Sequence, residues 1–468
     1  MNRVSKNLMN AWLSMGTRFL PFADAATPDL PLSRLLRLSL IQVSVGMCLV
    51  LLIGTLNRVM IVELNVPASL VGIMISLPLL FAPFRAVIGF RSDTHKSALG
   101  WRRVPFIYRG TMLQFGGLAL MPFALLVLAG AGQSGSAPAW IGQSAAALSF
   151  LLVGIGLHTT QTVGLALATD LASVESQPKV VGLMYVMLLA GTIASALIFG
   201  ALLADFSPGR LIQVIQGCAV ATIVFNGIAL WKQEPRRRVL EPVEPERAPS
   251  FSETWAEFIR QDQAIRRLLA VGVGTMAFSM EEVLLEPYGG QILDLTVGGT
   301  TTLSAALAVG GLAGFGWASR VLSRGADPFR MAGYGALAGI PAFMAVIASA
   351  PLSSIPLFAA GTMLIGFGAG LFGHGTLTAT MRDAPRNQAG LALGSWGAVQ
   401  ATGAGLGIAL GGILRDVGGA FAPAYGLGEA AGYHFVYCSE IALLFVALVT
   451  MIPLMRRIGN AEAKMAVS

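Results

Sequence analysis

Repeated apolar runs, each long enough to cross a lipid bilayer, constrain this sequence more than any other feature. An α-helix rises 1.5 Å per residue, so about 20 apolar residues cross a hydrocarbon core roughly 30 Å thick. Twelve segments meet that length, near residues 38–62, 66–89, 104–130, 139–168, 179–204, 209–231, 268–290, 299–321, 330–350, 355–380, 388–413 and 433–455. The sequence therefore predicts an all-α membrane protein with 12 transmembrane helices.

The composition agrees with this class. Only 12% of the 468 residues are charged, whereas soluble domains are about a quarter charged. In a membrane protein, a net charge of +7 indicates topology and contact with anionic lipid, so we expect the bilayer and no nucleic acid as partner. Cys48, Cys218 and Cys438 lie in apolar segments without paired spacing, and we predict small core residues rather than a disulfide or metal set.

The positions of the basic residues predict the orientation. One set of alternate loops holds clusters of basic side chains: Arg91, Lys96, Arg102 and Arg103, then Lys232, Arg236, Arg237, Arg238 and Arg247, then Arg320, Arg324 and Arg330, then Arg382 and Arg386. The opposite loops offer little beyond Arg210 and Arg415. Because cytoplasmic loops carry the excess of Lys and Arg, both termini are predicted to be cytoplasmic.

A long charged segment divides the chain. The predicted organisation is a cytoplasmic arm (1–37), a six-helix half (38–231), a cytoplasmic central loop (232–267), a second six-helix half (268–455) and a cytoplasmic tail (456–468). The central loop is rich in proline and charge, and a capping-box-like start at Ser252 predicts a surface helix within it.

Two correspondences suggest that the halves are repeats. Residues 63–66 (ELNV) precede the second span, and residues 294–297 (DLTV) precede the eighth. Residues 200–205 (GALLAD) end the fifth span, and residues 412–416 (GILRD) end the eleventh. Two pseudo-symmetric six-helix halves repeated in parallel would build a central site near the midplane of the membrane.

The loop GFRSDTHKSALGWRR (89–103) carries Gly89, Asp93, Arg102 and Arg103. A glycine, an Asp four residues on and then basic residues resemble the loop signature of the major facilitator superfamily, although that pattern has its second glycine earlier than Gly100. With 12 spans and the half repeat, the resemblance implies the fold of that superfamily and a cytoplasmic gate in this loop. The alternative is an ordinary positively charged loop that only sets topology.

Polar side chains inside spans are candidates for function because hydrocarbon penalises them. His158 and Gln161 share a face of the fourth span, and His158 lies about 18 Å of helix from Asp170. In the tenth span His374 lies about 13 Å from Asp383. Each histidine can ligate a metal ion, including the magnesium of a chlorin, or relay a proton. The alternative is a hydrogen bond that only holds neighbouring helices together.

The seventh span adds carboxyl groups. Glu281 and Glu282 point about 100° apart on a helix, so we expect one to pair with Arg58 or Arg109 and the other to carry a proton; a purely structural ion pair is the alternative. Pro287 is expected to break this helix near its outer end. The predicted intramembrane charge network consists of Arg58, Arg109, Glu281, Glu282 and Glu286.

Six stretches closely resemble the PucC family, a branch of the major facilitator superfamily: GTLNRVMIVELNVPASLVG (54–72), SDTHKSALGWRR (92–103), GIGLHTTQTVGLALATD (154–170), EEVLLEPYGGQIL (281–293), GSWGAVQATGAG (394–405) and YHFVYCSEIALLF (433–445). The resemblance implies a light-harvesting antenna assembly factor that binds bacteriochlorophyll as transient cargo and delivers it to antenna polypeptides. It implies that the protein lies in the intracytoplasmic photosynthetic membrane, which is an inner membrane of phototrophic bacteria. It also makes bacteriochlorophyll synthase a further candidate partner. PFADAATPDLPLSRLLRLSL (21–40) resembles the members that serve light-harvesting complex 2. The oligomeric state stays open.

Pigment-binding candidates are then His158, Gln161 and His374, with the bacteriochlorophyll magnesium held by His158 or His374 and no metal bound by the protein directly. Two other functions stay open: a proton-coupled small-molecule transporter that uses Glu281 or Glu282, and a scaffold for antenna polypeptides that binds no pigment. An enzyme is not expected, because no nucleophile–base pair, nucleotide loop or metal-ligand cluster emerges from the sequence.

Overall fold

The computed structural model describes residues 30–80, 88, 91–92, 101–130, 138–173, 176–234, 260, 263–383 and 389–455. Within these ranges all regular structure is helical. Eleven helices are long and apolar enough to span a membrane, which confirms eleven of the predicted spans. The second predicted span contains the apolar helix α5 (Ala68–Leu80), and residues 81–87 lie outside the described part of the chain.

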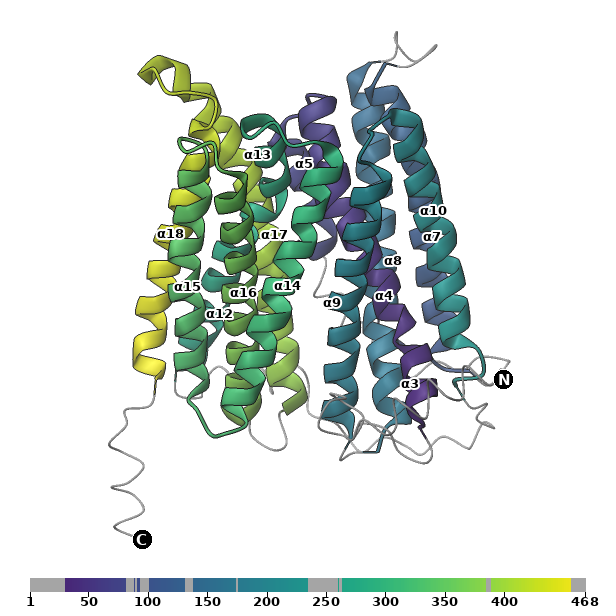
Figure 1. Cartoon of the computed structure of the whole chain (residues 1–468). Helices are drawn as coiled ribbons and strands as arrows, with labels where there is room; N and C mark the ends of the chain where they lie inside the picture. The colour runs from purple at the N-terminus through teal and green to yellow at the C-terminus, as the bar shows by residue number, and fades with distance from the viewer. Residues whose placement is uncertain are drawn as a thin grey trace.

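The helices form two groups that lie side by side (Figure 1). The first group contains α3 (Leu32–Leu38), α4 (Leu40–Leu49), η2 (Val50–Leu56), η3 (Val59–Glu63), α5, α7 (Val104–Leu128), α8 (Ala139–Leu171), α9 (Gln177–Leu202) and α10 (Pro208–Leu230). The second contains α12 (Ala264–Ser279), η5 (Glu281–Val283), α13 (Leu285–Ile292), α14 (Val297–Leu322), α15 (Pro328–Ser349), α16 (Ile355–Asp383), α17 (Ala389–Phe421) and α18 (Ala431–Met451), followed by the short turn η7 (Ile452–Leu454). We call the end that carries α3 and the last turn of α18 the terminus side.

Two helix ends differ from the sequence prediction. The first span runs from Leu32 to Glu63, so the predicted arm 1–37 extends too far and its last residues are helical. In the second half, α17 continues to Phe421, beyond the predicted end at residue 413. Arg415 therefore lies in a helix, where it forms an ion pair with Asp416 at 3.0 Å, and not in a loop.

The turns before α5 and α14 confirm the internal repeat and correct its register. Asn65 and Asp294 both adopt a left-handed backbone, with φ 51° and 53°, three residues before their helices begin. The residues before them, Leu64 and Leu293, also have matching angles (φ −103° and −112°). The sequence comparison matched Glu63 with Asp294, whereas the structure matches Asn65 with Asp294, a shift of two residues.

Glycine contacts join the two halves at the end opposite the terminus side. A Cβ added at Gly200 of α9 would lie 3.0 Å from the carbonyl oxygen of Gly298 in α14, and one added at Gly412 of α17 would lie 3.1 Å from the Cα of Ser69 in α5. These are equivalent contacts in the two halves. The helices α9 and α14 diverge from there toward the terminus side (Figure 1).

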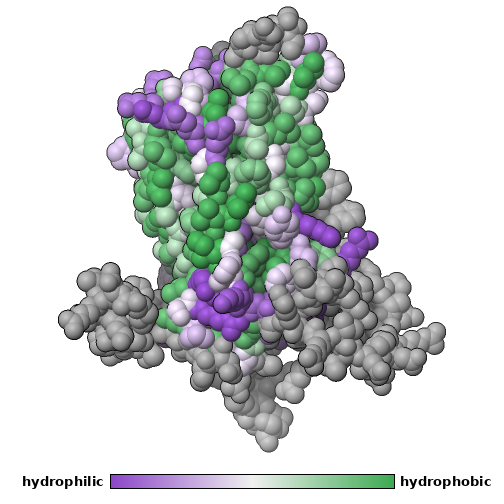
Figure 2. Space-filling model, turned by 90° about the vertical axis from the view of Figure 1, so that its right-hand side faces the viewer, coloured by the Kyte–Doolittle hydropathy of each residue, from purple (hydrophilic) through white to green (hydrophobic). Residues whose placement is uncertain are grey.

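The outer surface of the bundle is apolar. Figure 2 looks onto the side formed by α7 and α10, where apolar residues cover the middle and polar residues gather toward the ends. Exposed side chains there include Phe123, Val220 and Val224. An apolar belt between polar ends is what a lipid-facing surface requires. The prediction of small core cysteines holds for Cys48 and Cys218, which are buried, but is wrong for Cys438, which is exposed.

Candidate functional site

A cavity of about 420 Å³ lies between the two halves. Its walls come from α4, η2 and α9 of the first half and from α12, η5, α13, α14 and α16 of the second. The walls are mainly apolar, and the charged groups in the lining are Glu281, Glu282 and Glu286. The cavity is therefore an apolar space with acidic groups on one wall and no cation among the described lining residues.

A break in the seventh span turns these carboxyl groups toward the cavity. The chain leaves α12 at Ser279, passes through the 3-10 turn η5 and resumes as α13 at Leu285. Pro287 has no backbone N–H and its ring clashes with the carbonyl four residues earlier, so the interruption comes before the proline. The prediction of a break near the outer end of the helix is wrong, because Pro287 and the glycines after it lie inside α13.

Glu286 is the carboxyl group most firmly held in the cavity. It is 4% exposed, and it accepts a hydrogen bond of 2.6 Å from the hydroxyl of Ser304. A Cβ added at Gly54 would lie 2.5 Å from its Oε1. Gly54 stands in the π-helical stretch η2, a geometry often found at functional sites. A glycine on the first half thus lets a carboxyl group of the second half approach its backbone.

The two intramembrane arginines do not pair with Glu281 or Glu282 as predicted. Arg58, 4% exposed, forms an ion pair with Glu63 at 2.6 Å and donates to the carbonyl of Leu295 at 2.9 Å. It therefore joins the first span to the turn before α14. Arg109 is exposed, with its guanidinium 5.9 Å from the ring centre of Phe106. The direction of Glu281 and Glu282 depends on the helix break, which a regular helical wheel does not contain.

None of the three pigment-binding candidates belongs to the cavity lining. His158 and Gln161 are half-buried on α8. His374 is closer to the cavity, because its ring centre lies 4.2 Å from that of Phe315, a lining residue. Its Nδ1 is buried and has no hydrogen-bond partner among the described residues. His374 thus lies next to the cavity, one helical turn beyond Gly370.

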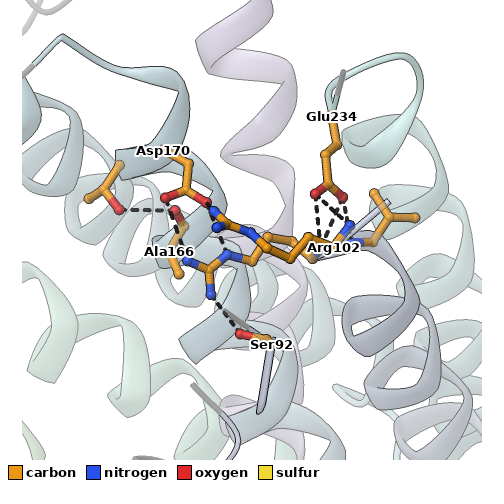
Figure 3. Close-up of polar contacts among 8 residues, drawn as sticks. Ser92, Arg102, Ala166, Asp170 and Glu234 are labelled. Carbon is orange, nitrogen blue, oxygen red and sulfur yellow. Dashed lines mark hydrogen bonds and ion pairs between the residues drawn. The ribbon is translucent and has the colours of Figure 1, made fainter. Parts of the chain in front are cut away.

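A second polar cluster lies at the terminus side of the first half (Figure 3). Asp170, at the end of α8, pairs with Arg102 at 2.5 Å and with Arg103 at 3.0 Å. Arg103 also donates to the hydroxyl of Ser92 at 2.6 Å. Glu234, beyond the end of α10, accepts from the backbone N–H groups of Arg102, Arg103 and Val104 at 2.8 to 3.0 Å. These N–H groups begin α7 and have no partner inside a helix, so Glu234 caps α7.

The predicted gate loop is thus described only in part. Arg102 and Arg103 hold α7 to α8, whereas Gly89 and Asp93 lie outside the described residues. Asp170 and Glu234 were not among the predicted partners of this loop. Asp170 was visible as an acidic residue at the end of a span, but nothing in the sequence placed Glu234 beside α7.

Asp170→Asn is expected to destabilise the fold by about 3 kcal/mol, because it leaves the buried guanidinium of Arg103 without its carboxylate. The side chain of Arg103 is 6% exposed. Unfolding of the detergent-solubilised protein in denaturant measures the change. Asp205→Asn is the matched control, since the side chain of Asp205 is 97% exposed and 3.6 Å from Arg210; such a pair contributes about 0–1 kcal/mol. Equal losses in both variants would contradict a structural role for Asp170.

Glu440 was not among the predicted site residues. It lies on α18, is completely buried, and neither of its carboxyl oxygens has a side-chain hydrogen-bond partner among the described residues. The signal was present, because Glu440 is the acidic residue in an otherwise apolar run of more than 20 residues.

Solved structures of several transporters share this fold. A bacterial homologue of the iron transporter ferroportin in an inward-facing state gives a TM-score of 0.66 at 16% identity, with 90% of this chain and 98% of that chain covered. A bacterial homologue of the lysosomal transporter Spinster, inward-facing and occupied, gives 0.65 at 15% identity, with 89% and 95% covered. The fold is that of the major facilitator superfamily, as the sequence predicted.

Several proteins are far more similar to this chain in sequence than these transporters are. Protein PucC of Rhodovulum sulfidophilum is 66% identical over 418 residues, 89% of this chain and 92% of that one. Protein PucC of Cereibacter sphaeroides is 58% identical, with 97% and 98% covered. A chain of Rhodobacter capsulatus named bacteriochlorophyll synthase 44.5 kDa chain is 28% identical, with 89% and 94% covered. The family model described as PUCC protein matches residues 55–459, and this multi-pass membrane protein therefore belongs to the PucC family.

Proposed function

We propose that this protein is a non-enzymatic assembly factor that receives bacteriochlorophyll and delivers it to light-harvesting antenna polypeptides. Membership of the PucC family is the observation that carries the proposal, together with the distant relative named as a bacteriochlorophyll synthase chain. We place the protein in the photosynthetic membrane with its terminus side in the cytoplasm. Light-harvesting complex 2 is the antenna we propose it serves.

The central cavity suits part of such a cargo. Its volume of about 420 Å³ falls in the range of about 300–1,000 Å³ that small-molecule pockets occupy. Apolar walls and glycines would accept a flat apolar ring, and the hydrocarbon tail of the pigment would extend between helices into lipid. A carrier must also release its cargo, and the lining offers no cation or metal cluster among the described residues that would hold it tightly.

His374 is the magnesium ligand that we propose, in preference to His158. Its imidazole lies against Phe315 of the cavity wall, and its Nδ1 is not engaged in a hydrogen bond with a described residue. A neutral imidazole with an available nitrogen is a suitable ligand for the magnesium of a chlorin. His158 and Gln161 lie outside the lining and would contact the pigment only along its path into the cavity.

The test is an absorption spectrum of the protein purified in mild detergent from cells that make bacteriochlorophyll but no antenna polypeptides. We expect a shifted pigment band at near-stoichiometric amount, reduced in His374→Ala and retained in His158→Ala. If neither variant loses the band, His374 is not the magnesium ligand, although the proposed function still stands. No bound pigment, with antenna polypeptides co-purifying from wild-type cells, would establish a pigment-free scaffold instead.

A proton-coupled small-molecule transporter is the second candidate, because three carboxyl groups line the cavity and buried carboxyl groups serve as proton relays in membrane proteins. Uptake of a small molecule into proteoliposomes, driven by a proton gradient and abolished by Glu282→Gln, would favour this function over pigment delivery.

A further inference from the structure

Four buried oxygen atoms of η5 and α18 have no side-chain hydrogen-bond partner among the described residues. They are Oε2 of Glu281, both carboxyl oxygens of Glu440 and the hydroxyl of Tyr437. The exposed fractions of these residues are 2%, 0% and 0%. The large majority of buried side-chain polar atoms have a hydrogen-bond partner, so these four oxygens need an explanation.

The helix break brings these groups together. Glu281 is the first residue of η5, where the seventh span leaves its regular helix, and α18 packs against α12, the helix that ends just before η5. The carboxyl group of Glu440 lies beside the backbone of Glu281, and the two carboxyl groups would repel each other if both were charged. Glu281 also lines the central cavity. It therefore stands between the cavity and Glu440.

The surrounding elements supply no described positive charge to this pair. From η5, Glu282 adds a further acidic group. From α13 and α18, Tyr288, Tyr433 and Tyr437 stack edge-on, and the hydroxyl of Tyr288 donates to the carbonyl of Val346 in α15. His434 is 3.4 Å from that tyrosine hydroxyl.

Arg415, on the helix α17 that packs against both α18 and η5, is already engaged. Arg415 of α17 pairs with Asp416 at 3.0 Å and donates to Gln291 at 2.7 Å. Its guanidinium stacks 4.9 Å from the ring centre of Tyr433. The two carboxyl groups therefore have each other, tyrosine hydroxyls and Glu282 as their polar surroundings.

Two adjacent carboxylates cannot both stay charged in such a place. Burying one ion costs several kcal/mol even after the protein relaxes, and two carboxyl groups that share a site hold a proton between them. We propose that Glu281 and Glu440 form a proton-binding site behind the central cavity, and that Glu281 exchanges this proton with the cavity. When the site is full both carboxyl groups are protonated; on release the O–H bond of Glu281 breaks, its proton passes to water in the cavity, and one carboxylate remains beside the neutral carboxyl group of Glu440.

This site goes beyond pigment delivery and does not depend on the identity of the cargo. It gives the protein a group whose charge can respond to what occupies the cavity, because a cargo that excludes water would keep the proton in place.

Infrared difference spectroscopy of the whole protein in lipid tests the site without requiring access of a reagent. At neutral pH the wild type is expected to show the C=O stretching band of protonated carboxyl groups. Part of that band should disappear in Glu440→Gln and in Glu281→Gln, and the contribution of both should be lost in the double variant. Raising the pH of the wild type should remove the same component. Asp205→Asn, at a carboxyl group that is 97% exposed, should leave the band unchanged.

Two results would overturn the proposal. One is an identical protonated-carboxyl band in wild type and double variant, which would place the protons elsewhere. The other is loss of the band on adding Na⁺ at constant pH, which would make these oxygens a cation site. The pH titration of the wild type decides the matter even where a Gln variant does not fold, since a band that is absent over the whole pH range in which the protein stays folded excludes a proton on this pair. Pigment content is read separately, so failure of this site and failure of pigment delivery are distinguishable.

Discussion

Ala369→Trp is expected to reduce the bacteriochlorophyll that co-purifies with this protein by roughly tenfold or more. Ala369 is half-buried on α16 and lines the central cavity, so an indole there would occupy the space proposed for the pigment ring. Overpacking costs about 1–3 kcal/mol, and since each 1.4 kcal/mol is a factor of about ten in affinity, the middle of that range corresponds to a loss of more than about tenfold. Pigment per protein, measured from the absorption spectrum of the purified protein, reports the effect.

Val220→Trp is the control for this substitution. Val220 lies on α10 and is 57% exposed, so lipid can make room for a larger side chain there. We expect its pigment content and elution volume to equal those of the wild type. If Ala369→Trp folds normally and keeps its pigment, the cargo does not bind in the central cavity, and the outer surface becomes the place to search.

The span pattern was predictable because it depends on local properties. Length and hydropathy alone identify helices such as α7, α15 and α18 to within a few residues. The repeat was also visible, but its register was not. Residue identity pairs Glu63 with Asp294. The backbone instead requires a left-handed residue three positions before each helix, and Asn65 and Asp294 meet that requirement.

The partners inside the membrane were not predictable in the same way. A helical wheel treats the seventh span as a regular helix. Pro287 interrupts that helix at the residues that precede it, and the interruption changes the direction of Glu281 and Glu282. The glycines of α16 also have a role that depends on the tertiary fold. A Cβ at Gly370 would lie 2.5 Å from the carbonyl oxygen of Gly311 in α14, so this glycine permits close helix packing, and it lines the cavity as well.

Glu63→Ala is expected to destabilise the protein by about 3 kcal/mol, more than Arg58→Met does. Arg58 is 4% exposed, and removing one partner of a buried ion pair costs about 3–5 kcal/mol because the remaining charge is left uncompensated. The carbonyl of Leu295 still accepts from Arg58, which keeps the loss near the lower limit. Arg58→Met instead leaves the carboxylate of Glu63, which is 38% exposed, and the carbonyl of Leu295 without their donor. We expect this variant to lose about 1–3 kcal/mol of stability.

The double variant Arg58→Met/Glu63→Ala separates this asymmetry from general damage at the junction of the halves. If the cost of Glu63→Ala comes from the uncompensated charge, removing that charge as well should restore stability, and the double variant should unfold at a higher denaturant concentration than Glu63→Ala alone. Residues in contact show such coupling, typically about 0.5–3 kcal/mol. Additive losses would mean that Glu63 stabilises the turn before α5 by itself. Arg58 would then hold the first span to α14 through Leu295 alone, and the ion pair would contribute nothing to the junction of the two halves.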